Sequence, residues 1–333
     1  MLQSQNWFGV VAVLSALSAP AVAQAQEPVR IGIGSGLAFL PAYICDDLDL
    51  IEKYGKEAHL DLKATFPRFT GAGPLQDALA AGAIDIAPFG VAPLLSDWGK
   101  ANGSPRQLLA VSGMTTLSPV LLTNRANVRT LADFGKDDRI AIPAATSPQL
   151  YFLQMQSEKQ FGKYDKLRSR IVVLSHPQAT GELMGEGGPL AGYFSSAPYT
   201  EIALAEGRIH KVFSGADVIG GKASFLILAA SKSYVAAHPG VAAAVAKAMD
   251  EAARLIHDDP YHAAEIFLVR EPSKTLDVAA VTAIIGDIKD EFGSEVHGVQ
   301  TFAEFLGRHG GLKSPPKSWK EIVAPALLNS PSS

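Results

Sequence analysis

The chain has one cysteine among 333 residues, so no disulfide can form within it and no cysteine-based metal site is available. Cys45 also lies far from the N-terminus, which leaves no cysteine for a lipid anchor after a leader segment. A chain of this length buries roughly three quarters of its surface, so a hydrophobic core can stabilise it without disulfides. We therefore expect Cys45 to be a small buried hydrophobic side chain.

Charge is scarce as well. Charged residues make up 19% of the chain and the net charge is -4, which excludes the clustered basic surface of a nucleic-acid-binding protein. The eight histidines are scattered without an H-E-x-x-H pair, and no G-x-S-x-G or G-x-x-x-x-G-K-[ST] segment occurs. We expect neither an enzyme nor an ATPase, and we expect no metal and no cofactor.

No long apolar run is present that would make a transmembrane span, but a shorter one lies near the N-terminus. Residues 7–17 are apolar or small, and Ala23 or Ala25 closes a small-x-small cleavage pattern. Residues 1–25 are therefore predicted to be a cleaved signal peptide, although residues 1–6 carry no Lys or Arg. The mature protein is expected in the periplasm.

The remainder of the chain alternates between strand and helix patterns. Val29 to Ile33, Ile84 to Phe89 and Arg139 to Ile142 have strand character, and helical spacing follows each of them. This order predicts an α/β fold with largely parallel sheets flanked by helices. From Tyr234 onward the pattern is helical, and the Pro- and Ser-rich tail from Ser314 is expected to lie on the surface or to fray.

Four stretches carry a family resemblance, and they are R-I-G-I-G-S-G-L-A-F-L-P-A-Y from Arg30, Q-D-A-L-A-A-G-A-I-D-I-A-P-F-G-V-A-P from Gln76, L-A-D-F-G-K-D-D-R-I-A-I-P from Leu131 and A-G-Y-F-S-S-A-P-Y from Ala191. In their order and spacing they resemble the periplasmic substrate-binding components of ABC transporters in the nitrate/sulfonate/taurine class. That class shares a domain with thiamine-pyrimidine precursor proteins.

The resemblance implies a two-lobed periplasmic binding protein type II fold, each lobe a mostly parallel sheet flanked by helices. Lobe 1 would comprise residues 28–116 and 222–333, and lobe 2 residues 117–221, with hinge strands near 118–123 and 214–222. The lobes would close around a small molecule by hinge motion. The closed protein, expected to be a monomer, would then dock on an ABC permease that is powered by separate ATPase subunits.

Small residues gather where predicted strands end, and most of these loops precede a helix whose free N–H groups favour an anion. Arg68 could clamp an anion or lie on the surface. Ser147 and Ser196 could contact a ligand or simply cap helices, and Gly71 and Gly90 could be turn glycines. The predicted ligand-binding residues are Ser35, Gly36, Leu37, Phe39, Phe69, Thr70, Gly71, Phe89, Gly90, Val91, Thr146, Ser147, Tyr193, Ser195 and Ser196.

Few charges and many aromatic residues near these loops favour a small anionic or aromatic organic solute: a sulfonate, a taurine-like compound, a carboxylate or a pyrimidine precursor. Nitrate fits less well because no dense cluster of donors is evident. A secreted ligand sensor and a TRAP-type import protein stay open as alternatives. A pyrimidine-precursor enzyme is the least favoured, because one cysteine cannot supply the cysteine-rich motif of the fungal synthases.

Overall fold

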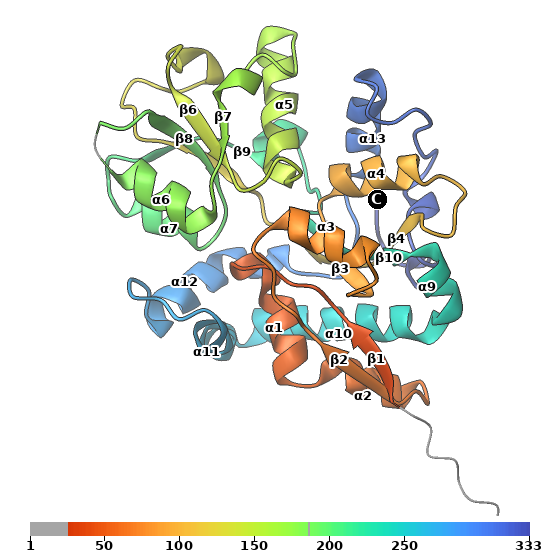
Figure 1. Ribbon diagram of the computed structural model, residues 1–333. Helices are drawn as coiled ribbons and strands as arrows, with labels where there is room; N and C mark the ends of the chain where they lie inside the picture. Colours follow the sequence, from red (N-terminus) through yellow and green to blue (C-terminus); the bar gives the residue numbers. More distant parts are fainter. Residues whose placement is uncertain (1–25, 186) are drawn as a thin grey trace, which may run out of the picture.

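The computed structural model describes residues 26–185 and 187–333, which form two lobes (Figure 1). The predicted signal peptide, residues 1–25, lies outside the described residues. No helix in the described ranges is both long enough and apolar enough to cross a membrane.

Lobe 1 contains a two-stranded and a three-stranded sheet, with strand orders β1-β2 and β3-β10-β4. A parallel bridge between Ile31 and Ile86 joins them. The strands are β1 (Glu27–Arg30), β2 (Leu62–Thr65), β3 (Ile86–Phe89), β4 (Leu108–Thr115) and β10 (Leu226–Ser231). The helices of this lobe are α1 (Leu40–Asp47), α2 (Leu50–Glu57), α3 (Ala72–Ala80), α4 (Val91–Lys100), α9 (Lys232–Ala237), α10 (Pro239–Asp258), α11 (Pro260–Arg270), α12 (Val278–Ile288) and α13 (Val299–Arg308).

Lobe 2 contains one five-stranded sheet with the order β7-β6-β8-β5-β9. Its strands are β5 (Val120–Thr123), β6 (Arg139–Ile142), β7 (Ile171–Val173), β8 (Leu190–Ser195) and β9 (His210–Ser214). Its helices are α5 (Pro148–Phe161), α6 (His176–Met184), α7 (Tyr199–Leu204) and α8 (Gly215–Ile219). In each lobe the strand that follows a crossing, β5 or β10, runs antiparallel to both neighbours, and the pairing is otherwise parallel. The predicted α/β fold with sheets flanked by helices is thus confirmed, and its sheets mix parallel and antiparallel pairing.

Only one of the two crossings between the lobes agrees with the predicted hinge strands. The first crossing leads into β5, as expected, but the prediction of a strand at 214–222 is wrong because helix α8 lies there. Ser214 Oγ accepts a hydrogen bond from the Asp217 amide at 3.3 Å, and Asp217 Oδ2 accepts one from the Ser214 amide at 2.8 Å. This capping box starts a helix where the family resemblance implied a hinge strand.

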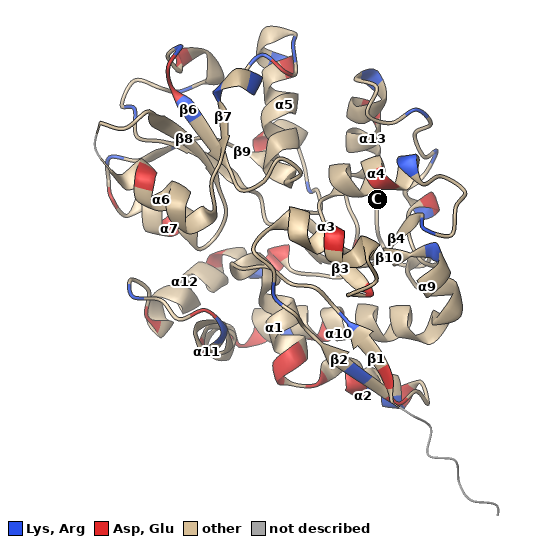
Figure 2. Ribbon diagram, viewed as in Figure 1, with Lys and Arg blue, Asp and Glu red and all other residues tan. Residues whose placement is uncertain are grey.

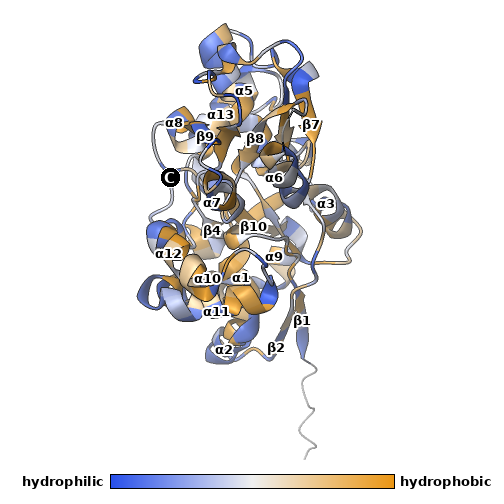
Figure 3. Ribbon diagram, turned by 90° about the vertical axis from the view of Figure 1, so that its left-hand side faces the viewer, coloured by the Kyte–Doolittle hydropathy of each residue, from blue (hydrophilic) through white to orange (hydrophobic). Residues whose placement is uncertain are grey.

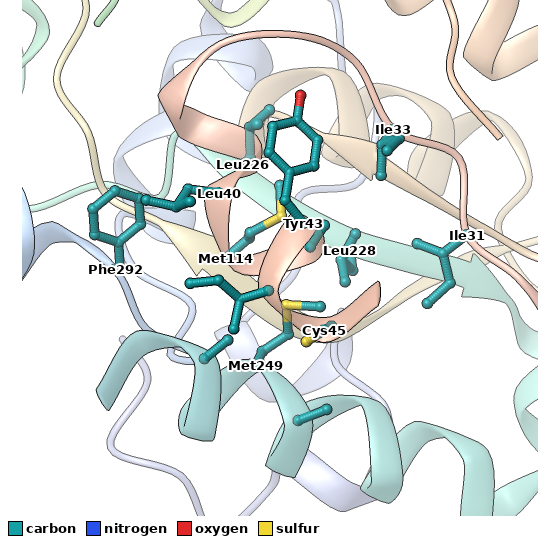
Figure 4. Packing of buried hydrophobic residues seen from close by; sticks show 14 of the residues in the cluster. Ile31, Ile33, Leu40, Tyr43, Cys45, Met114, Leu226, Leu228, Met249 and Phe292 are labelled. Atoms are coloured by element: carbon teal, nitrogen blue, oxygen red, sulfur yellow. The ribbon is translucent and has the colours of Figure 1, made fainter. Parts of the chain in front are cut away.

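Side chains alternate between two hydrophobic clusters along β10. Leu228 and Ala230 face one cluster, which also holds α1 and α10, whereas Ile227 and Ala229 face the other, as expected from the period of two of a strand. Figure 3 shows the hydrophobic colour concentrated along α1 and β10. Cys45 is fully buried in the first cluster, as predicted (Figure 4).

The second cluster connects the lobes. Phe152 of α5 meets Phe302 of α13 edge to face, with ring centroids 5.5 Å apart, and both belong to this cluster together with Leu94 of α4. The two lobes therefore share hydrophobic packing on the side of α4, α5 and α13.

The C-terminal tail, expected to lie on the surface or to fray, does not fray, and part of it is buried. Ile322 O accepts a hydrogen bond from the Ala110 amide, and the Ala324 amide donates to Ala110 O, both at 2.7 Å. Ile322 and Ala324 are fully buried. The tail covers the outer edge of β4, which would otherwise expose unpaired backbone groups.

Candidate functional site: the cleft between the lobes

The predicted binding loops of the two lobes meet. The Leu37 amide of lobe 1 donates to Ala197 O of lobe 2 at 3.2 Å. A methyl group added at Gly90 in lobe 1 would lie 2.4 Å from Cγ of Pro148 in lobe 2. The loops that follow β1 and β3 therefore face those that follow β6 and β8, and we call the region between them the cleft.

The starts of two helices lie opposite each other in the cleft, because α4 begins after Gly90 and α5 after Ser147. Ser147 makes no side-chain capping bond, and its Oγ has no hydrogen-bond partner within residues 26–185 and 187–333. The same is true of Gln149 Oε1, and the two residues are 3% and 1% exposed. Buried polar groups are almost always paired, so this helix start could receive a polar ligand group.

An aromatic and histidine cluster forms the lobe 2 side of the cleft. His176 stacks on Tyr199 with ring centroids 5.2 Å apart and an interplanar angle of 8°. Its Nε2 lies 3.3 Å from Ser196 Oγ, and its Nδ1 contacts the Tyr193 hydroxyl. Burial of the imidazole lowers the pKa of His176 to about 4, so the ring is neutral at pH 7.

A second polar cluster lies on the lobe 1 side. Glu271 Oε1 accepts a hydrogen bond from the Gly36 amide at 2.7 Å and contacts the Tyr43 hydroxyl. Arg68 Nη1 lies 3.7 Å from the same oxygen, and its guanidinium lies 5.0 Å from the centre of the Tyr43 ring. Figure 4 shows the Tyr43 hydroxyl pointing away from the hydrophobic cluster that holds its ring.

The two clusters influence each other across the cleft. The pKa of the Tyr199 phenol is raised, first by burial and then by the negative charge of Glu271. Glu271 and Tyr199 come from different lobes, so this coupling reflects their proximity in the present arrangement.

The predicted residues fall into four groups in the structure. Ser35, Thr70 and Thr146 are exposed, while Phe39, Phe69 and Gly71 are half-buried. The side chains of four others pack in hydrophobic clusters and are at most 3% exposed: Leu37, Phe89, Val91 and Tyr193. The remaining five are buried glycines and serines of the loops and strand ends between the lobes: Gly36, Gly90, Ser147, Ser195 and Ser196.

Sequence reasoning missed His176, Gln149 and Glu271. His176 had a usable signal, since His176-Pro177 lies just after the apolar stretch that forms β7 (Ile171–Val173), and helix starts that follow strands gather at the cleft. Glu271 had none, because it ends α11 and lies 235 residues from its partner Gly36. Arg68 does lie at the cleft, but it faces the carboxylate of Glu271 rather than a free space.

Two cavities of about 230 and 330 Å³ lie at the crossings rather than in the cleft, and both are lined by Thr116, Lys222 and Glu291. None of the predicted binding residues lines either cavity. Within the described part of the chain, no three His, Cys, Asp or Glu side chains gather as a metal ion requires. Charged residues lie mainly on outer elements, and Figure 2 shows the central strands β3, β8 and β10 without them.

Two lobes of sheets flanked by helices, whose strand-end loops face one another, have the fold of the periplasmic binding proteins. The chain belongs to the NMT1-like family, whose family model matches residues 23–269. This match and the fold confirm the resemblance to nitrate/sulfonate/taurine-class binding proteins. No curated protein sequence matches the chain significantly.

Solved structures share this fold at low sequence identity. The alkanesulfonate-binding protein SsuA of Xanthomonas axonopodis pv. citri, bound to MOPS, has a TM-score of 0.67 and 19% identity, covering 91% of this chain and 99% of that one. The aliphatic sulphonate-binding protein SsuA of Escherichia coli has a TM-score of 0.67 and 17% identity, covering 90% and 98%. The nitrate-binding protein NrtA of Synechocystis PCC 6803 has a TM-score of 0.67 and 13% identity, covering 91% and 87%.

Proposed function

We propose that this chain is a periplasmic binding protein that delivers a small organic anion, such as a sulfonate, a taurine-like compound, an aromatic carboxylate or a pyrimidine precursor, to an ABC importer. It binds and releases its solute without catalysis. The fifteen residues predicted from the sequence are candidates for the contacts, with His176, Gln149 and Tyr199 added to them.

The observation that carries the proposal is the buried, unpartnered Ser147 Oγ at the start of α5, opposite the start of α4. Two helix starts present free N–H groups and partial positive charge to the same point, which favours an acidic group. Arg68 is a weaker candidate for this role, because Glu271 already lies 3.7 Å from it.

A ligand screen by thermal shift tests the proposal. The panel contains taurine, alkyl and aryl sulfonates, aromatic carboxylates and pyrimidine precursors, with a neutral sugar and bare metal ions for comparison. Binding at 100 times Kd adds about 2.7 kcal/mol to the unfolding free energy, which raises Tm measurably. If no anion raises Tm while the sugar or a metal ion does, the proposal is wrong.

Two serine variants test the position of the acidic group. Ser147→Ala is expected to weaken binding of a panel hit by about tenfold, the effect of losing a hydrogen bond to a charged group, with little change in Tm. Ser231→Ala is the matched control, since Ser231 Oγ does cap α9 by accepting from the Tyr234 amide at 3.1 Å. The control should cost about 1 kcal/mol of stability and leave affinity unchanged. Equal affinities for Ser147→Ala and the unaltered protein, measured by calorimetry, would reject this position.

Export and partners complete the proposal. Residues 1–25 are proposed as a signal peptide cleaved at Ala23 or Ala25, which N-terminal sequencing of the exported protein tests. Lobe 1 is proposed to span 28–116 and 222–333, and lobe 2 to span 117–221. Neighbouring genes for an ATPase and a permease are expected, whereas a histidine kinase or a TRAP membrane pair there would favour the alternatives.

A further inference from the structure

The loop of residues 34–37 is held by the side chain of Glu271, 235 residues from Gly36, and by that of the nearby Tyr43. Glu271 Oε1 accepts from the Gly36 amide at 2.7 Å. The Tyr43 hydroxyl lies within hydrogen-bond distance of both Glu271 Oε1 and Gly34 O, the latter at 3.0 Å. Charged acceptors make the stronger hydrogen bonds, so the carboxylate of Glu271 is the main fixed point of this loop.

The same loop makes the backbone contact between the lobes. The Leu37 amide donates to Ala197 O at 3.2 Å, one residue after the amide that Glu271 holds. Gly36 has φ of 103°, a conformation that glycine adopts without strain, and a methyl group there would lie 3.3 Å from Ala197 O. The direction of the Leu37 N–H group is set by the backbone conformation of Gly36. Glycine is flexible, so this conformation is held by the hydrogen bond from the Gly36 amide to Glu271.

We propose that Glu271 is a positioning residue for lobe closure: it fixes the 34–37 loop in the shape that lets the Leu37 N–H reach Ala197 O. This inference rests on the proposed function, since closure serves ligand capture. Arg68 supplies the counter-charge to Glu271 from within lobe 1, so the carboxylate needs no ligand cation. Glu271 thus stabilises the closed arrangement of the empty protein as well as that of the loaded one.

The experiment measures lobe distance in the ligand-free protein. Exposed positions on the two lobes are labelled through Glu57→Cys and Lys166→Cys, which is selective because Cys45 is fully buried. Pulsed electron spin resonance then gives the closed and open populations. Glu271→Ala is expected to lower the closed-to-open ratio about tenfold, the effect of losing a hydrogen bond to a charged acceptor.

Three further variants separate positioning from a general structural role. Glu271→Gln keeps an amide oxygen for the Gly36 N–H and should retain most of the closed population. Tyr43→Phe removes one contact to Glu271 and should have an intermediate effect. Glu265→Ala removes an exposed carboxylate from the same helix and should have no effect.

A purely structural role would lower Tm in Glu271→Ala and leave the closed-to-open ratio unchanged. The inference is overturned if the closed-to-open ratio is the same in both proteins. It is also overturned if neither protein shows a closed population. The lobe distances are measured without ligand. If no compound of the thermal-shift panel raised Tm, the proposed function would be rejected, but the result for Glu271 would be unaffected.

Discussion

At the scale of single residues, His176 makes stability depend on pH. Its folded-state pKa of about 4 lies below the ordinary value of 6.5, because burial disfavours the charged ring. Between these pH values the unfolded chain takes up a proton and the folded protein does not, so unfolding becomes easier as pH falls. The stability that comes from a neutral His176 is complete above about pH 6.5 and is lost progressively toward pH 4.

Urea unfolding at pH 7 and pH 4.5 checks this prediction. His176→Gln keeps a polar side chain for the Tyr193 and Ser196 hydroxyls but does not titrate. The variant should lose less unfolding free energy between the two pH values than the unaltered protein does. Equal losses in both proteins would show that His176 is protonated in the folded state, contrary to its burial.

At the scale of elements, the start of α4 controls how closely the lobes approach. Gly90 has φ of -75° and ψ of 162°, which alanine adopts without strain, but a methyl group there would lie 2.4 Å from Pro148 Cγ of the other lobe. Gly90→Ala should therefore lower the Tm of the ligand-free protein, in which α4 and α5 already pack together, and weaken ligand binding at least tenfold. Calorimetric titration with a panel hit measures this effect.

Gly73→Ala is the matched control for that substitution. Gly73 lies in α3 of the same lobe, and an added methyl group would meet no atom within 4 Å. Alanine inside a helix stabilises by up to about 1 kcal/mol relative to glycine, so the control should gain stability and keep its affinity. Equal affinities for Gly90→Ala and Gly73→Ala would mean that α4 and α5 do not approach during closure.

Sequence patterns predicted the elements well where local signals and packing agreed. Val29 to Ile33 and Arg139 to Ile142 were predicted as strands. The first overlaps β1 and the bridges at Ile31 and Ile33, and the second is β6. The prediction failed at 214–222, where the resemblance implied a hinge strand but a local capping box starts a helix, and in the tail, where Ile322 packs on an edge strand that no local pattern reveals. Contacts over long sequence distance, such as Glu271 with Gly36, were likewise outside the reach of local patterns.

At the scale of the whole molecule, the two lobes share a core rather than standing as separate folding units. The second hydrophobic cluster contains Phe152 and Phe194 from lobe 2 together with Leu94 and Phe302 from lobe 1. Arg308 Nη2 and His309 Nε2 of lobe 1 also bond to Glu158 of α5, at 3.0 and 2.7 Å. Breaking either lobe would expose the apolar surface of the other, so unfolding should be cooperative across the cleft.

Two optical probes with different coverage test whether the lobes unfold together. In protein prepared without residues 1–25, which contain Trp7, the tryptophans are Trp98 and Trp319 of lobe 1. Tryptophan fluorescence then follows that lobe, whereas far-ultraviolet circular dichroism follows both. We expect coincident denaturant midpoints for the intact protein. Phe302→Ala removes the ring that meets Phe152, should cost about 3–5 kcal/mol, and should separate the two midpoints because the lobes then lack their common packing. If the dichroism of the intact protein keeps changing after the fluorescence has reached its plateau, lobe 2 is stable alone and the shared cluster does not couple the lobes.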